Sequence, residues 1–182
     1  MPSITTHELT YAALFAALIA GGAFIAIPIG SVPFTLQVLC VLLAGMLLGP
    51  RLAAFSVLAY LALGLVAPVY AGGTSGLGVL FGPTGGYLWG FLPAAMVTGA
   101  VCARGERSLP RFVGAGLLGL VPIYAFGALW LAAQLHIGMG TAFATGVAPF
   151  VWLDVLKAVA AGLAARALVS LPLGLPVTQG GR

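Results

Sequence analysis

Two charged residues, Asp154 and Lys157, lie inside an otherwise apolar stretch of the sequence. Their spacing of three residues places both side chains on the same face of a helix, within reach of each other. A charged group inside a membrane is costly, so such residues are rare and usually face a transport pathway or a binding site. On this interpretation Asp154 accepts hydrogen bonds from N–H groups of a ligand, and Lys157 donates to a carbonyl or carboxylate group of the ligand.

The same pair has a structural alternative, an internal ion pair that only neutralises itself. Such a pair can be replaced by apolar residues at little cost in stability. Two neighbouring aromatic residues, Phe150 and Trp152, would form apolar walls around a ligand. A lipid-facing or packing role explains these two aromatic residues equally well.

Two further motifs stand where helices are expected to begin near the same membrane face. The first contains Thr35 and Gln37, and the second contains Gly82, Thr84 and Tyr87. The free N–H groups and the dipole at a helix N-terminus bind anions, so an organic carboxylate would be stabilised there. Simple helix capping is the alternative for both motifs, although Gln37 would be a buried amide that needs hydrogen-bond partners.

A stripe of small residues runs along the first apolar segment. It consists of Ala12, Ala16 and Ala20, with Ala13, Ala17 and Gly21 beside it. Small residues at this spacing allow another helix to approach closely in a membrane. The partner of the stripe is either a helix of the same chain or an external subunit.

The composition identifies the environment in which these residues act. Of 182 residues, 62% are hydrophobic and 5% are charged, and the mean hydropathy is +1.17. About a quarter of the residues of a soluble domain are charged, and a disordered chain requires low hydrophobicity and high net charge. The seven scattered Lys and Arg residues form no basic stripe for nucleic acid. The composition therefore predicts a polytopic integral membrane protein.

Six apolar segments are predicted to cross the membrane, since a spanning helix needs about 20 apolar residues. Division at Gly, Pro and charged residues gives spans at residues 9–28, 34–48, 52–71, 85–103, 112–135 and 143–169. We expect an all-α fold of six transmembrane helices in a single domain, residues 1–182. An even number of spans places both termini on the same side of the membrane.

The distribution of arginine indicates which side faces the cytoplasm. One side of the predicted topology carries Arg51, Arg104, Arg107, Arg111, Arg166 and Arg182. The loops at residues 29–33, 72–84 and 136–142 contain no Lys or Arg. Because cytoplasmic loops carry an excess of Lys and Arg, we expect both termini in the cytoplasm and these three loops on the outside.

The second span, residues 34–48, would be about 22 Å long as a helix, which is less than the hydrocarbon thickness of about 30 Å. The nearby segment 72–86 contains seven glycine residues around an apolar run and no charged residue. Irregular backbone is tolerated at membrane depth only where it is buried in protein or lines a cavity. We expect the outer loops to form a folded lid over an outward-facing pocket, with a disordered glycine linker as the alternative.

The sequence provides no set of residues for catalysis or metal binding. His7 and His136 have no Cys or carboxylate at ligand spacing, and Asp154 is the only acidic residue expected within the membrane. We therefore expect no enzymatic reaction, no bound metal and no cofactor. The chain also lacks a phosphate-binding loop, so active transport would take its energy from a partner or from an ion gradient.

Three motifs can be compared with a known family. They are VPFTLQ at residues 32–37, GVLFGPTGGYLWGF at residues 78–91 and DVLK at residues 154–157. Together they resemble the BioY family, the biotin-binding S components of energy-coupling-factor transporters, and the resemblance extends over essentially the whole chain. It implies a six-helix protein of the cell membrane that binds biotin from outside with high affinity.

The resemblance also implies partners and site residues. The partners are a transmembrane scaffold subunit and two ATP-binding-cassette ATPases, which bind the ATP. The residues implied to contact biotin are Asp154 and Lys157, with Thr35, Gln37, Gly82, Thr84 and Tyr87 as motif positions near the site. The surface implied to meet the scaffold subunit is the stripe of Ala12, Ala16 and Ala20.

Two other functions remain open from the sequence. An S component for another vitamin, such as thiamine or riboflavin, would share the fold. A proton-coupled secondary carrier would use Asp154 as its proton-binding group.

Overall fold

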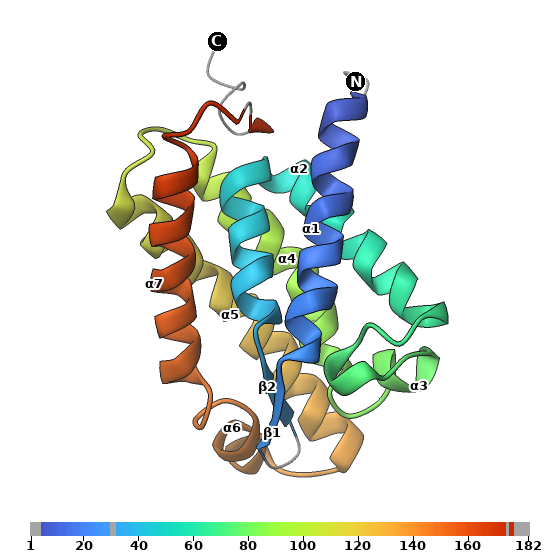
Figure 1. Cartoon of the computed structure of the whole chain (residues 1–182). Helices are drawn as coiled ribbons and strands as arrows, with labels where there is room; N and C mark the ends of the chain where they lie inside the picture. The colour runs from blue at the N-terminus through green and yellow to red at the C-terminus, as the bar shows by residue number, and fades with distance from the viewer. Residues whose placement is uncertain (1–4, 30–31, 174, 177–182) are drawn as a thin grey trace.

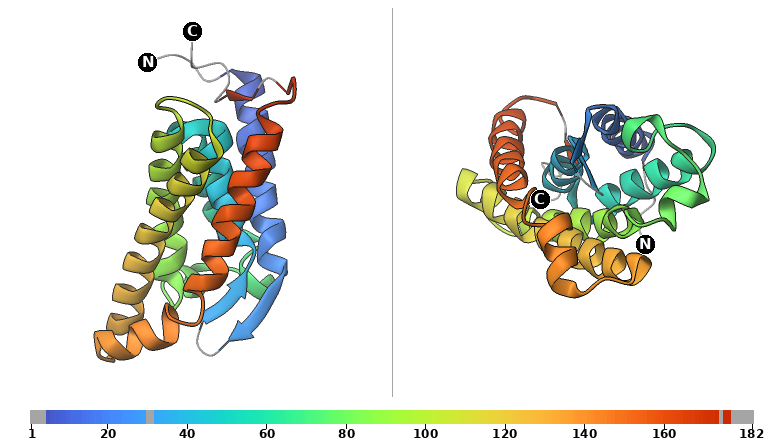
Figure 2. Two further views of the ribbon diagram at one scale, coloured as in Figure 1. Left: turned by 90° about the vertical axis from the view of Figure 1, so that its left-hand side faces the viewer. Right: turned by 90° about the horizontal axis from the view of Figure 1, so that it is seen from below.

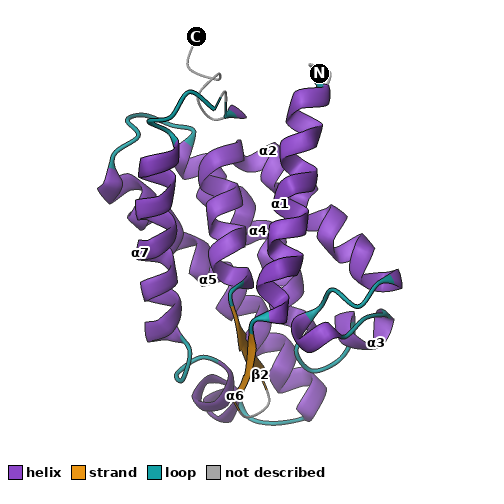
Figure 3. Ribbon diagram, in the orientation of Figure 1, coloured by secondary structure: helices purple, strands orange, loops and turns teal. Residues whose placement is uncertain are grey.

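The computed structural model describes residues 5–29, 32–173 and 175–176, and most of them are helical (Figure 3). In chain order the elements are α1 (Thr6–Phe24), β1 (Ala26–Ile29), β2 (Val32–Thr35), α2 (Gln37–Val66), η1 (Ala71–Gly73), α3 (Leu77–Leu80), α4 (Gly85–Cys102), α5 (Leu109–Leu135), α6 (Met139–Gly146) and α7 (Val151–Leu168). Figure 1 shows that α1 begins and α7 ends at the same end of the bundle. The hairpin β1–β2, α3 and α6 lie at the opposite end, which we call the hairpin end.

The first helix begins with a reciprocal cap. The Thr5 side chain accepts a hydrogen bond from the backbone N–H of Glu8, and the Glu8 carboxylate accepts one from the Thr5 N–H at 2.8 Å. This capping box satisfies two donors that a helix start leaves free. The helix ends at Phe24, four residues before the predicted end of the first span, because the chain then enters a strand.

The strands β1 and β2 pair in antiparallel fashion, with Ala26 opposite Thr35 and Ile29 opposite Val32. The expectation of a purely all-α fold with a helix from residue 34 was therefore wrong in this segment. Pro28 and Pro33 lie opposite each other in the hairpin. Proline lacks the N–H for a central ladder and is confined to sheet edges, and a two-stranded sheet consists only of edges.

The helix α2 consists of two segments joined at a sharp turn. Gly49 has φ 78° and ψ 173°, which are not helical values, and Pro50 follows it. A positive φ favours glycine, and proline begins a helix well because it lacks the N–H that would be free there. Figure 1 shows α2 rising from the hairpin and then descending towards α3 after this turn. The predicted break between residues 48 and 52 is thus confirmed.

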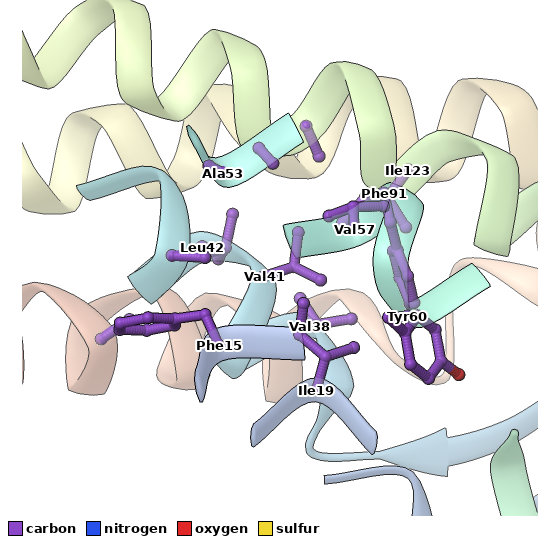
Figure 4. Packing of buried hydrophobic residues seen from close by; sticks show 14 of the residues in the cluster. Phe15, Ile19, Val38, Val41, Leu42, Ala53, Val57, Tyr60, Phe91 and Ile123 are labelled. Carbon is purple, nitrogen blue, oxygen red and sulfur yellow. The ribbon is translucent and has the colours of Figure 1, made fainter. Parts of the chain in front are cut away.

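Small residues allow the helices to pack closely around the core. α4 packs against both α2 and α5, and a Cβ atom added at Gly99 would lie 2.5 Å from the backbone nitrogen of Pro50. Close approach through small residues is typical of membrane helices. Figure 4 shows the apolar side chains that fill the bundle, including Phe15 of α1, Val41 of α2 and Phe91 of α4.

Within the described residues, α1, α2, α4 and α5 are each long and apolar enough to cross a membrane. The helices α6 and α7 are bent by 52° at a short break and would together form a fifth such segment. The predicted last span at residues 143–169 is thus interrupted, since α7 begins only at Val151. Figure 2 shows the bundle from the side and from the hairpin end.

The contact at Gly99 yields a prediction about stability. Replacing Gly99 with Ala forces α4 away from the turn at Gly49 and Pro50, and we expect a loss of about 1–3 kcal/mol, the usual cost of overpacking. The measurement is thermal unfolding of the purified protein in detergent. Gly114→Ala in α5 is the control because an added Cβ there meets nothing within 4 Å. Equal melting temperatures of the two variants would contradict this packing role.

Candidate functional site

A cavity lies near the hairpin end, among α2, α4, α5, α7, the hairpin and the segment from η1 to α4. Its lining consists of Val32, Pro33, Phe34, Thr35, Gln37, Val38, Ala71, Val79, Thr84, Tyr87, Leu88, Phe91, Ile123, Tyr124, Gly146, Phe150, Asp154 and Lys157. The volume of this cavity, counted as the space open to the centres of water molecules, is about 70 Å³. One water needs about 10–15 Å³ on the same measure. Mostly apolar walls with a few convergent polar groups are typical of small-molecule sites.

Asp154 and Lys157 form an ion pair at the wall of this cavity. The Lys157 Nζ atom lies 2.6 Å from the Asp154 Oδ1 atom, and the two residues are 5% and 6% exposed. The break after α6 places Asp154 in the first turn of α7, where the helix dipole favours a negative charge. The structure therefore confirms that the two side chains share one helical face and meet.

Two other elements hold this ion pair. The Tyr124 hydroxyl of α5 donates a hydrogen bond to the Asp154 Oδ2 atom. The Lys157 ammonium group also donates to the backbone carbonyl of Thr35 in β2, at 2.6 Å, and lies 3.7 Å from the centroid of the Phe34 ring. The pair thus joins α5, α7 and the hairpin. Among the described residues, every buried side-chain nitrogen or oxygen atom has a hydrogen-bond partner.

Thr35 and Gln37, which sequence motifs had singled out, form a second polar chain at the cavity. The Thr35 hydroxyl donates to the Gln37 side-chain oxygen at 3.0 Å, and the Gln37 amide nitrogen donates to the Tyr60 hydroxyl. The backbone N–H of Gln37, at the start of α2, donates to the Thr35 hydroxyl oxygen at 3.3 Å. This N–H is therefore capped within the chain, as the capping alternative predicts.

The motif before α4 is only partly at the cavity. Thr84 and Tyr87 line it, whereas Gly82 does not. The Gly82 carbonyl accepts a hydrogen bond from the Trp130 indole N–H at 3.0 Å, so this residue fixes the loop to α5. The Tyr87 hydroxyl donates to the Gly146 carbonyl at 2.8 Å, which fixes α4 to the end of α6.

The segment between α2 and α4 is folded and covers part of the cavity. The buried Tyr70 donates its hydroxyl hydrogen to the Leu61 carbonyl at 2.7 Å, and its backbone pairs with Thr74. Ala71 and Val79 of this segment line the cavity. A folded cover was predicted here, and a disordered glycine linker is contradicted.

The two aromatic residues near Asp154 have different positions. Phe150 is buried and lines the cavity. Trp152 is 60% exposed and is not part of the lining. The interpretation of Trp152 as a wall of the site is therefore not supported, and its position fits the lipid-facing alternative. Residues two positions apart at a helix do not lie on the same face, which separates the ring of Phe150, the N-cap of α7, from that of Trp152.

The small-residue stripe faces the inside of the chain. Ala12, Ala16 and Ala20 are buried, and α1 packs against α2. The assignment of this stripe to an external subunit is thus corrected, since the intramolecular alternative explains its burial. The neighbouring residues Ala13 and Ala17, together with Gly21, are exposed instead.

Sequence reasoning missed several residues of the site. Tyr124 lies 30 residues from Asp154 in the chain, and Tyr60 lies 23 residues from Gln37, so no local spacing relates them. The signal that could have found them is the need of a buried tyrosine hydroxyl for a hydrogen-bond partner. Phe34 was part of a motif, but its contact with Lys157 depends on the hairpin.

A bundle of apolar helices around a small, partly polar cavity defines the class of membrane proteins that bind a small solute. A family model described as the BioY family matches residues 1–172. The chain is 42% identical to the biotin transporter BioY of Thermotoga maritima over 166 residues, 91% of this chain and 97% of that protein. It is 44% identical to the biotin transporter BioY of Rhodobacter capsulatus over an alignment of 181 residues, which covers 89% of this chain and 93% of that protein.

A solved structure agrees with these sequence comparisons. The S component for biotin from an ECF-type ABC transporter matches with a TM-score of 0.85 and 31% sequence identity, over 93% of this chain and 96% of that chain. The chain belongs to the BioY family.

The buried ion pair yields a prediction about the ligand-free protein. Lys157→Met leaves the Asp154 carboxylate buried without its counter-charge, and we expect a loss of about 3–5 kcal/mol in stability. Asp154→Asn introduced into the same chain should recover most of the lost stability, since both charges are then absent. Melting temperatures of the three proteins in detergent measure the effect. A Lys157→Met protein as stable as the wild type would contradict the electrostatic coupling.

Proposed function

We propose that the chain is the biotin-binding S component of an energy-coupling-factor transporter, which captures biotin for ATP-driven uptake. The observation that carries this function is the Asp154–Lys157 pair at the wall of an apolar cavity. Membership of the BioY family and the names of its relatives support biotin as the ligand. The chain acts in binding and transport and is not an enzyme.

The chemistry of the cavity fits the chemical groups of biotin. Biotin has a ureido group with two N–H donors and a carbonyl, an apolar thioether ring and a tail with a carboxylate. Asp154 accepts from an N–H group, and the lining residues Phe91, Ile123 and Phe150 provide apolar contacts for the rings. Lys157 provides the donor for a carbonyl or a carboxylate, since the backbone N–H groups of Gly85 and Tyr87 at the start of α4 already donate to the carbonyls of Gly82 and Thr84.

For the topology we propose that the chain crosses the cell membrane six times, with both termini in the cytoplasm. The turn at Gly49 supports two crossings by α2, one on each side of it. Arg51 follows the turn at Gly49, Arg104 follows the end of α4 and Arg166 lies in the last turn of α7, all towards the end where α1 begins. Residues 25–29, 32–36, 67–84 and 136–150, at or near the hairpin end, contain no Lys or Arg. Under the positive-inside rule the cavity then faces outwards.

For the partners we propose a scaffold subunit and two ATP-binding-cassette ATPases. The surface for the scaffold subunit is the exposed small face of α1, formed by Ala13, Ala17 and Gly21. This surface replaces the buried stripe that the sequence suggested. Its small side chains allow a helix of the partner to approach the α1 backbone closely.

Biotin binding is tested directly by calorimetric titration of the purified protein. We expect saturable binding by the wild type, and Asp154→Asn should weaken it by about tenfold to a hundredfold, the equivalent of one hydrogen bond to a charged group. The variant should keep its fold, because the Thr35 carbonyl and the new amide oxygen still accept from Lys157.

Thiamine and riboflavin are the control ligands in the same titration. Absence of biotin binding by folded wild-type protein would contradict the function, and binding of one of the control vitamins instead would assign another substrate. Uptake driven by a pH gradient without the ATPases would indicate a secondary carrier.

The scaffold surface is tested by tryptophan substitution on two faces of α1. Ala17→Trp should keep biotin binding and prevent co-purification with the coupling module, since the bulky ring blocks close helix approach. Ala16→Trp should lower the stability of the S component itself, because Ala16 is buried. Ala125→Trp, at an exposed alanine of α5, is the control for added bulk on the surface. Normal assembly of Ala17→Trp would refute this surface.

A further inference from the structure

The Asp154 carboxylate is held at both of its oxygens. Lys157, one turn along the same helix, donates to Oδ1 at 2.6 Å. Tyr124, on the neighbouring helix α5, donates to Oδ2. A carboxylate has about four lone-pair sites, so about one site on each oxygen is left for a ligand.

Lys157 alone does not determine how this carboxylate is oriented. Its ammonium group is also engaged by the Thr35 carbonyl and the Phe34 ring, and both belong to the hairpin. With a hydrogen bond to only one of its oxygens, the carboxylate can still rotate about that hydrogen bond. A second donor that comes from a different helix removes this rotation.

Tyr124 is well placed to be that second donor. α5 packs against both α4 and α7, and the preceding residue Ile123 is buried in the core. The ring of Tyr124 is part of the cavity lining and is half-buried. Its single hydroxyl proton is given to Asp154, so the donor capacity of the phenol is already used before a ligand enters.

We propose that Tyr124 is a positioning residue for biotin, which acts through Asp154. Its hydroxyl holds the carboxylate in one orientation and leaves one fixed acceptor site on each oxygen. Biotin binding then costs less side-chain conformational entropy, because the Asp154 carboxylate that accepts the hydrogen bond is already ordered. This role rests on the proposed biotin binding and adds to it a residue that provides no ligand hydrogen bond of its own.

The first test is a double-mutant cycle in biotin affinity. Tyr124→Phe removes only the hydroxyl, and we expect it to weaken biotin binding by about tenfold. In the Asp154→Ala background the same change should alter the affinity by less than about twofold, because its target is gone. Additive losses would show that Tyr124 contacts biotin directly or acts through packing, and would overturn the proposal.

The matched control for the cycle is Tyr87→Phe, at another tyrosine of the cavity lining. The Tyr87 hydroxyl donates to the Gly146 carbonyl and not to Asp154. Whatever loss this variant shows should add in full to that of Asp154→Ala. If Asp154→Ala fails to fold, the cycle is built on Asp154→Ala combined with Lys157→Met, which removes both charges.

The second test needs no ligand and reads Asp154 alone. Asp154 is the only aspartate in the sequence, so aspartate labelled with a carbon isotope at the carboxylate reports on one residue. We expect Tyr124→Phe to shift the infrared carboxylate band of the ligand-free protein, and Tyr87→Phe to leave it in place. An unshifted band in Tyr124→Phe would overturn the proposal.

The two tests separate this role from the proposed function. If the folded wild type does not bind biotin, the proposed function fails and the positioning role fails with it. If the wild type binds biotin and Tyr124→Phe binds it equally well, only the role of Tyr124 fails.

Discussion

The ion pair between Asp154 and Lys157 is the interaction on which the site depends. Two opposite charges in a low-dielectric interior attract strongly, but each has lost its water and requires further hydrogen bonds. The protein provides these from Tyr124 on α5 and from the Thr35 carbonyl on β2. The pair therefore links α5, α7 and the hairpin, and the cavity lies among them.

Breaks in regular helices shape both the site and the rest of the bundle that supports it. The break between α6 and α7 starts α7 at Val151, which places Asp154 in a first helical turn. The turn at Gly49 reverses α2, and Gly99 lets α4 pack against that turn. The hairpin extends a short first segment of α2 and brings the Thr35 carbonyl to Lys157.

The sequence predicted what depends on local spacing and composition. The membrane environment, the break near residue 49 and the meeting of Asp154 with Lys157 follow from hydropathy, from glycine with proline and from helical periodicity. The hairpin was missed because its residues are as apolar as a span. The contact of Tyr124 with Asp154 and the inward direction of Ala16 depend on which helices pack together, and one sequence does not give this packing.

The most direct test of the central claim uses the fact that Lys157 is the only lysine and Asp154 the only aspartate in the sequence. The measurement is nuclear magnetic resonance of the two isotope-labelled side chains during a biotin titration. We expect both signals to change and to reach a plateau at one biotin per chain. Saturable biotin binding in the same sample with both signals unchanged would show that the pair only neutralises itself.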